Sequence, residues 1–223
     1  MLHADVEALV FDAYGTLFDV HSVATLAERL APGHGAAISQ LWRSKQLEYT
    51  WLGSLMERRK DFAEVTVQAL DYTLAALVLP LAAPARAELV RAWLDLEPFA
   101  DTIPTLERLA PRPRWILSNG TRAMLDPLVE RSGVGAHLAG VLSVDEAGIY
   151  KPSPRVYALA TRRLDLEPSA IGFVSANGWD AAGAKAYGFT VWWINRAGLP
   201  IDRHGPDPDF IVGSLAEIAI GGS

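Results

Sequence analysis

One carboxylate in this sequence stands where it could act as a nucleophile. Asp12 follows the apolar run 8–11 and precedes a turn at Gly15. If the run is a β-strand, the carboxylate lies at the strand tip, where the turn exposes backbone N–H groups that could hold an anionic substrate beside it. An aspartate that closes a strand is more commonly a turn-capping residue. Asp12 alone therefore leaves catalysis and a structural cap open.

Further polar groups follow apolar runs later in the chain. Ser118 and Asn119 come directly after residues 115–117, and Lys151 precedes a proline near the expected start of a helix. Taken singly, these are ordinary turn residues and a solvated lysine. The six residues after the run 171–174 are different, because they contain three polar side chains, Ser175, Asn177 and Asp180. Such density at a strand end favours a functional segment over a simple turn.

The elements that must position these side chains are short apolar strands. Runs without polar alternation are typical of strands buried on both faces of a parallel sheet. Helical segments lie between the runs, and this alternation predicts an α/β fold with an open sheet and with ligands at the carboxyl ends of the strands. The expected strands are residues 8–11, 115–117, 141–144, 171–174, 191–194 and 210–212, and two of the expected helices are residues 156–164 and 181–187.

A long insertion separates the first strand from the second. It contains amphipathic stretches of helix length, including residues 38–59 and 61–77, with prolines between and after them. We interpret it as a helical cap that covers the strand ends and could close the site against water. The predicted organisation is a Rossmann-like core of residues 1–19 and 99–223 with a cap domain of residues 20–98.

Composition limits the possible partners and location. The chain has 223 residues, a net charge of −6, no cysteine, and five histidines without metal-ligand spacing. An acidic chain has no general attraction for nucleic acid or for anionic membranes. The N-terminus lacks a basic region followed by an apolar run, and no apolar run is long enough to span a bilayer. We therefore expect a cytoplasmic protein with a small-molecule substrate and with no nucleic-acid or membrane partner.

The polar groups together resemble the four motifs of the haloacid dehalogenase superfamily: Asp-x-x-Gly-Thr, a Ser/Thr-Asn pair, Lys-Pro and an acidic loop. Within the superfamily, the chain is similar to the L-2-haloacid dehalogenases over nearly its whole length, from about residue 6 to residue 215. The segments that carry this similarity are residues 11–20, 41–52 and 173–180. The resemblance implies a metal-independent hydrolase without a cofactor. Such an enzyme displaces halide from a short 2-haloalkanoic acid through an ester on Asp12, with inversion at C2.

The resemblance also implies a role for each motif residue. The nucleophile would be Asp12, with Lys151 beside it and Arg43 of the cap meeting the departing halide. Other catalytic positions would orient these groups, the substrate carboxylate or the hydrolytic water. They are Thr16, Ser118, Tyr157, Ser175, Asn177 and Asp180. The positions implied to bind substrate or halide are Ala13, Tyr14, Arg43, Leu47, Phe62, Ser118, Asn119 and Trp179. A homodimer, formed through apolar cap surface, is implied as well.

Tyr14 separates this chemistry from that of related phosphatases. Phosphatases of the superfamily carry a second Asp two positions after the nucleophile, which protonates the leaving alkoxide, whereas a halide leaves as a stable anion. A haloacid is also a monoanion that a lysine can balance, so metal should be dispensable. The alternatives are a magnesium-dependent small-molecule phosphatase on the same fold and a non-catalytic binding protein. The preferred halogen, the chain length and the physiological substrate stay open.

Overall fold

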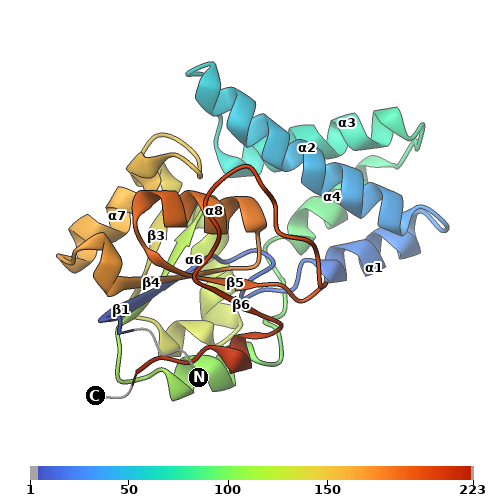
Figure 1. The fold of residues 1–223 in the computed structure, drawn as a ribbon. Helices are drawn as coiled ribbons and strands as arrows, with labels where there is room; N and C mark the ends of the chain where they lie inside the picture. The colour runs from blue at the N-terminus through green and yellow to red at the C-terminus, as the bar shows by residue number, and fades with distance from the viewer. Residues whose placement is uncertain (1–4, 222–223) are drawn as a thin grey trace.

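The computed structural model of the protein describes residues 5–221, which form one six-stranded sheet with helices around it (Figure 1). The strands are β1 (Ala8–Phe11), β2 (Arg114–Ser118), β3 (Gly140–Ser143), β4 (Ile171–Ser175), β5 (Thr190–Ile194) and β6 (Phe210–Val212). Neighbouring strands are parallel throughout, in the order β3-β2-β1-β4-β5-β6. The predicted parallel α/β sheet is confirmed.

The first strand lies at the centre of the sheet. Every residue of β1 is completely buried, and the strand pairs with β2 on one side and with β4 on the other. Val10 aligns with Trp115 of β2 and with Phe173 of β4. A strand covered on both faces and at both edges needs an uninterrupted apolar sequence, which explains why this run shows no polar alternation.

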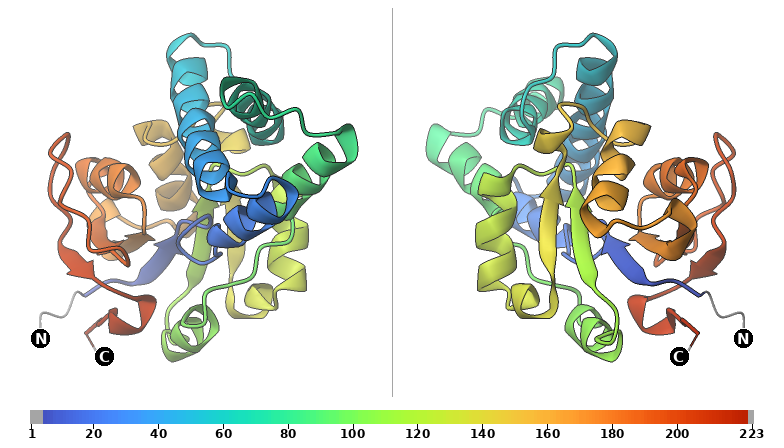
Figure 2. Two further views of the ribbon diagram at one scale, coloured as in Figure 1. Left: turned by 90° about the vertical axis from the view of Figure 1, so that its right-hand side faces the viewer. Right: turned by 90° about the vertical axis from the view of Figure 1, so that its left-hand side faces the viewer.

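The direction of the strand order reverses beside β1. The chain moves outward from β1 to β2 and β3, then returns to β4 on the other side of β1 and continues to β5 and β6. Right-handed crossovers that run in opposite directions place helices on both faces of a sheet, and helices lie on both sides in Figure 2. The carboxyl ends of β1, β2 and β4 therefore meet at the switch point, where open α/β sheets bind their ligands.

The helices of the core follow its strands. α8 packs against β4 and β5 and against α7, and it is capped by Gly188, whose φ of 112° stops the helix. The bounds are α5 (Thr102–Arg108), α6 (Arg122–Arg131), α7 (Pro154–Leu164) and α8 (Gly178–Tyr187), with short 3-10 turns at Val134–His137, Val144–Glu146, Pro168–Ala170 and Leu215–Glu217. Within residues 5–221, no helix is both long and apolar enough to cross a membrane.

The segment between β1 and α5 forms the inserted helical cap. Its helices are α1 (His21–Leu30), α2 (Gly35–Leu55), α3 (Phe62–Ala76) and α4 (Ala83–Ala92). They stand together as a group beside the core in Figure 1, with α2 packed against α1 and α3. Arg59, after α2, forms an ion pair with Asp145 just beyond β3, so the cap reaches the carboxyl edge of the sheet. The prediction of a cap inserted into a Rossmann-like core is confirmed.

The longest cap helix differs from the prediction at its ends. The sequence pattern predicts a helix over residues 38–59, whereas α2 both begins and ends earlier. It begins earlier because the Glu28 carboxylate accepts hydrogen bonds from the backbone N–H groups of Gly33 and Gly35, which satisfies donors at the start of the helix. It ends earlier because Glu57 has a φ of 55°, outside the right-handed helical region.

The chain leaves the core and returns to it at adjacent points. The Asp19 N–H donates to the Glu97 carbonyl at 2.8 Å, and the Phe99 N–H donates to the Leu17 carbonyl at 3.0 Å. This pairing closes the base of the cap with backbone hydrogen bonds. The exact cap boundaries, residues 20–98, stay a prediction that the pairing supports.

Candidate active site

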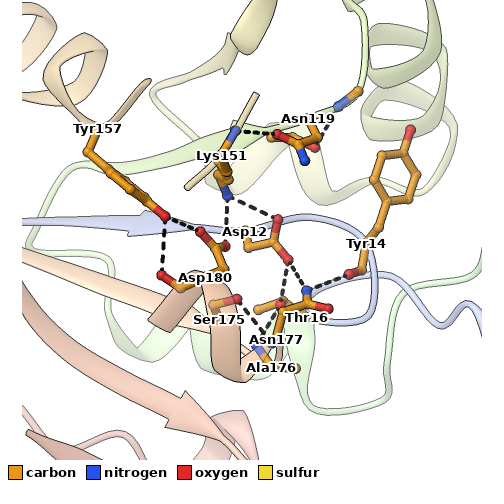
Figure 3. Close-up of polar contacts among 12 residues, drawn as sticks. Asp12, Tyr14, Thr16, Asn119, Lys151, Tyr157, Ser175, Ala176, Asn177 and Asp180 are labelled. Atoms are coloured by element: carbon orange, nitrogen blue, oxygen red, sulfur yellow. Dashed lines mark hydrogen bonds and ion pairs between the residues drawn. The ribbon is translucent and has the colours of Figure 1, made fainter. Parts of the chain in front are cut away.

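The carboxylate of Asp12 lies at the tip of β1, and both of its oxygens are held by neighbouring side chains (Figure 3). Oδ2 accepts hydrogen bonds from the Thr16 hydroxyl at 3.0 Å and from the Asn177 amide at 2.9 Å. Oδ1 accepts one from Lys151 Nζ at 3.2 Å. Asp12 is only 6% exposed, and these contacts fix the orientation of its carboxylate.

The ammonium group of Lys151 lies between two carboxylates. Its Nζ contacts Asp180 Oδ2 at 2.9 Å as well as Asp12, and the side chain is buried. Burial acts to lower the pKa of Lys151, but the two carboxylates outweigh it and the pKa lies above its ordinary value. Lys151 is therefore a cation throughout the neutral range. Its backbone N–H donates to Asn119 Oδ1 at 3.1 Å, which ties the lysine loop to the end of β2.

Asp180 is completely buried in the first turn of α8, and both of its carboxylate oxygens have partners. Besides the contact to Lys151, Oδ1 accepts a hydrogen bond from the Tyr157 hydroxyl at 2.7 Å. Burial raises the pKa of Asp180, against the opposing effect of Lys151. Burial and the adjacent Asp180 also raise the pKa of Tyr157, so its hydroxyl remains a proton donor. The Tyr157 ring is fixed by edge contacts to Phe173 and Phe189.

The loops after β1 and β4 are tied to each other by hydrogen bonds. The Thr16 hydroxyl, which donates to Asp12, accepts the Ala176 N–H at 2.9 Å. Ser175 Oγ accepts the Asn177 N–H at 3.1 Å, which orients the amide that reaches Asp12. These loops come from neighbouring strands, so the sheet order explains why distant segments of the sequence converge on one carboxylate.

The end of β2 provides a second wall of the site. Ser118 is completely buried, and its Oγ accepts the Gly120 N–H at 3.1 Å. Asn119 uses its Oδ1 for the lysine loop, and its Nδ2 has no hydrogen-bond partner within residues 5–221, which leaves it able to donate to an anion. Gly120 permits a close approach, since a Cβ there would lie 2.9 Å from the Tyr14 ring.

An aromatic group joins the cap to the nucleophile loop. The Tyr14 ring stacks on Phe62 of α3 at 5.8 Å and meets Trp93 edge to face at 5.6 Å. Arg43 of α2 lies over the same Trp93 ring, 5.7 Å from its centroid. Burial raises the pKa of Tyr14, and its buried hydroxyl has no protein partner in the described part of the chain. Trp93 has no counterpart among the sequence-predicted site residues, because no motif surrounds it.

Arg43 brings a positive charge from the cap toward the nucleophile. It is partly buried, and burial acts to lower its pKa while the charges of Asp12, Tyr14 and Asp180 act to raise it. A guanidinium remains protonated in proteins even when its pKa is lowered. The structure thus brings a cap cation within electrostatic range of Asp12. Without the family resemblance, an arginine on a cap helix would be interpreted as a surface residue.

The remaining predicted positions lie around this centre. Ala13 is buried, and its carbonyl accepts backbone N–H groups of the turn at Thr16. Leu47, one turn beyond Arg43 on α2, is partly buried. Trp179 packs edge to face on Trp51 at 5.5 Å and lines, with Lys151, a cavity of about 580 Å³ between cap and core. The roles of these positions stay predictions.

The arrangement supplies one held carboxylate, a lysine that balances it and a cap cation. No group of three or more His, Cys, Asp and Glu side chains in residues 5–221 is arranged to hold a metal ion. The two buried carboxylates of the site are bridged by Lys151 instead. Chemically, this suits attack by a carboxylate on a monoanionic substrate.

Comparisons with known proteins identify the family. The haloacid dehalogenase-like hydrolase family matches residues 6–188. The chain is 46% identical over 215 residues to the (S)-2-haloacid dehalogenase of Pseudomonas sp. (strain YL), covering 96% of this chain and 93% of the relative. The structure of L-2-haloacid dehalogenase from Xanthobacter autotrophicus matches with a TM-score of 0.89 at 41% identity, covering 95% of this chain and 96% of that one.

A second structure of the Xanthobacter autotrophicus enzyme, with chloropropionic acid covalently bound, matches with a TM-score of 0.88 at 40% identity. It covers 95% of this chain and 96% of that one. The resemblance carried by the sequence motifs is confirmed over nearly the whole length of both proteins. The chain therefore belongs to the haloacid dehalogenase-like hydrolase family, in the branch of the (S)-2-haloacid dehalogenases.

Proposed function

We propose that this hydrolase converts short (S)-2-haloalkanoic acids into (R)-2-hydroxy acids, with Asp12 as the nucleophile. An oxygen of the Asp12 carboxylate bonds to C2 from the side opposite the halogen, and the carbon–halogen electron pair leaves with the halide. Backside attack inverts C2. The product of this step is an ester between Asp12 and the acid, and a covalent complex with chloropropionic acid is reported for the Xanthobacter autotrophicus relative.

The observation that carries this proposal is the pair of contacts made by Lys151 Nζ, 3.2 Å to Asp12 and 2.9 Å to Asp180. A buried lysine places a positive charge beside the nucleophile without a metal and compensates the negative charge of an incoming carboxylate. Holding a nucleophile in line with its target removes an entropic barrier of up to roughly 7–11 kcal/mol. Thr16 and Asn177 supply that constraint on Asp12 through Oδ2.

The halide would leave toward the cap. Arg43 is the cation on that side, and the Asn119 amide donor and the Trp179 indole are the proposed remaining parts of the cradle. Hydrogen bonds to charged groups contribute about 1.5–3 kcal/mol each. Hydrogen-bond donors that stabilise the negative charge developing on the halogen therefore lower the activation barrier of the displacement, rather than only strengthening substrate binding. Leu47 and Phe62 would line the substrate pocket with apolar side chains.

Hydrolysis of the ester completes the cycle. Water attacks the carbonyl carbon of the Asp12 ester, the bond from that carbon to the substrate oxygen breaks, and one water proton passes to the departing alkoxide oxygen, which becomes the product hydroxyl. The other proton is released through Asp180, whose raised pKa favours proton uptake. The carboxylate of Asp12 is regenerated with one oxygen from water. Because no bond to C2 breaks in this step, the inversion is preserved.

A halide-release assay with both enantiomers of 2-chloropropionate tests the reaction. We expect chloride and D-lactate from the (S)-substrate and at least tenfold slower release from the (R)-substrate, since one pocket geometry cannot align both for backside attack. Ion chromatography measures chloride, and chiral chromatography identifies the lactate. Retention of configuration, or no chloride from either enantiomer, would contradict the proposal.

Removal of metal separates this reaction from the alternative, a magnesium-dependent phosphatase. We expect chloride release to be unchanged after dialysis against EDTA, because Lys151 already balances the nucleophile and halide needs no general acid. Hydrolysis of p-nitrophenyl phosphate, with and without added magnesium, is the matched assay. Loss of dehalogenation with chelator and its return with magnesium would favour the alternative.

The proposal also includes a homodimer that forms through the cap. It is supported by large apolar side chains of the cap that are exposed in the single chain. These are Leu52 and Leu55 of α2, Met56 directly after it, and Val67 and Tyr72 of α3. Large exposed apolar patches commonly mark protein interfaces.

A further inference from the structure

Gln46 is a completely buried polar side chain in the cap, and the motifs assign it no role. It lies one turn after Arg43 on α2. Its Oε1 accepts a hydrogen bond from Arg43 Nη1 at 2.6 Å, and its Nε2 donates to Thr66 Oγ1 of α3 at 2.7 Å. The amide thus connects the halide-facing arginine to the neighbouring cap helix.

The donor and acceptor of each hydrogen bond between Arg43, Gln46 and Thr66 can be assigned by starting from Thr66. The Thr66 hydroxyl lies 2.6 Å from the Phe62 carbonyl, which can only accept, so the hydroxyl donates its single proton there. The Thr66 oxygen must then accept the proton of Gln46 Nε2. The Gln46 oxygen consequently faces Arg43, and a flipped amide would point its donors at a guanidinium that has only donors.

The frame that holds this chain is rigid. Thr66 is 1% exposed, and its backbone carbonyl accepts the Trp42 indole N–H at 2.8 Å, so Trp42 and Gln46, one turn apart on α2, are both anchored on one residue of α3. Buried polar groups that lose their partners are costly, which holds the chain in this one arrangement. The guanidinium of Arg43 is confined at its edge by Gln46 and on its face by Trp93.

We propose that Gln46 is a positioning residue that aims the Arg43 guanidinium at the departing halide, with Thr66 as its anchor. An arginine side chain has several rotatable bonds, and only a narrow range of its conformations would meet the halogen on the axis of displacement. Gln46 and Thr66 restrict Arg43 to that range. The inference rests on the proposed dehalogenation and adds a residue that acts through Arg43.

Replacing Gln46 by Met keeps the length and volume of the side chain and removes both hydrogen bonds. We expect kcat on (S)-2-chloropropionate to fall about 10- to 100-fold, with little change in KM, because the contact that is lost serves the leaving group. Inhibition by added bromide should weaken in parallel, since free halide would bind the same guanidinium. Neither effect follows from a purely structural role.

A double-mutant cycle tests whether Gln46 acts through Arg43. In an Arg43→Lys background, the lysine cannot form the Gln46 contact in the same geometry, so adding Gln46→Met should change kcat by no more than about twofold. Equal fold-losses in the two backgrounds would overturn the inference. Wild-type protein that releases no halide would instead refute the proposed function itself, so the two failures are distinguishable.

Two threonines of α3 provide a matched pair in case Gln46→Met does not fold. Thr66→Val and Thr73→Val each delete a buried hydroxyl that donates to a carbonyl one turn earlier in the same helix, at 2.6 and 2.7 Å. Only Thr66 contacts Gln46. We expect Thr66→Val to lower kcat at least threefold more than Thr73→Val. Equal kcat for the two variants would count against an anchoring role.

Discussion

Replacing Asp12 by Asn is expected to abolish halide release, with a fall in kcat of about 10⁴-fold or more. The amide is nearly the same size as the carboxylate but is not nucleophilic, and no ester can form. Its oxygen can still accept hydrogen bonds from Thr16 and Asn177, and Lys151 keeps its partner Asp180. The fold should therefore survive the change. Ion chromatography of chloride from freshly prepared protein measures the loss, before deamidation can restore the aspartate.

A matched control is Asp126→Asn on α6. Asp126 pairs with Arg122 at the surface, and about half of each side chain is exposed. Exposed pairs of this kind contribute little to stability, so the variant should keep wild-type kcat. If freshly prepared Asp12→Asn retained more than a few per cent of wild-type activity, the carboxylate would not be the nucleophile.

Replacing Lys151 by Met is the second change with a large expected effect, and it acts on both rate and stability. Removing the cation leaves Asp12 and Asp180 as adjacent buried carboxylates, and breaking a buried ion pair in this way costs about 3–5 kcal/mol. We expect kcat to fall about 100-fold or more, because the nucleophile loses a charge-assisted contact and the substrate anion loses its counter-charge.

The stability loss of Lys151→Met should depend on pH in a defined direction. In the wild type the pKa of Lys151 is raised, so its stabilising contribution is complete below the ordinary lysine pKa of about 10.4 and disappears only as pH rises through the higher folded value. In the variant, Asp180 loses the lysine that opposes the effect of burial, so the pKa of Asp180 rises further in the folded state, folding takes up a proton and stability recovers as pH falls.

Urea unfolding at pH 8 and pH 5 checks this expectation. The difference in unfolding free energy between wild type and Lys151→Met should be smaller at pH 5. Lys185→Met, which breaks the more exposed pair with Asp209, should change the unfolding free energy by no more than about 1 kcal/mol at either pH and leave kcat intact. A difference that is independent of pH would contradict the proposed coupling of the buried charges.

The sheet was the most predictable part of the protein. Strands buried on both faces must be apolar throughout, so their runs stand out between helical segments, and the residues after 8–11, 115–117 and 171–174 could be recognised as strand tips. That Asp12 and Asn177 meet depends on β1 and β4 being neighbours, and the sequence contains no local signal for strand order. The motif resemblance supplied that information.

The cap was predictable in outline but not in its contacts. Trp93, directly after α4, contacts Tyr14 of the core and Arg43 of α2, and no sequence periodicity encodes these tertiary contacts. Gln46 did have a local signal, since a residue three positions after an arginine shares its helix face. The early end of α2 depends on the positive φ of Glu57. Glutamate rarely adopts this conformation, so the residue type gave no reason to predict the end of the helix there.

The proposed function requires that Asp12 bonds covalently to the substrate carbon. The most direct test is the fate of oxygen in ¹⁸O-labelled water, read by mass spectrometry of the peptide that contains Asp12 and of the hydroxy acid product. We expect unlabelled product in the first turnover and one labelled oxygen in the Asp12 carboxylate, with label reaching product only in later turnovers. Label in the first-turnover product, with none in Asp12, would show direct attack by water and contradict a covalent intermediate.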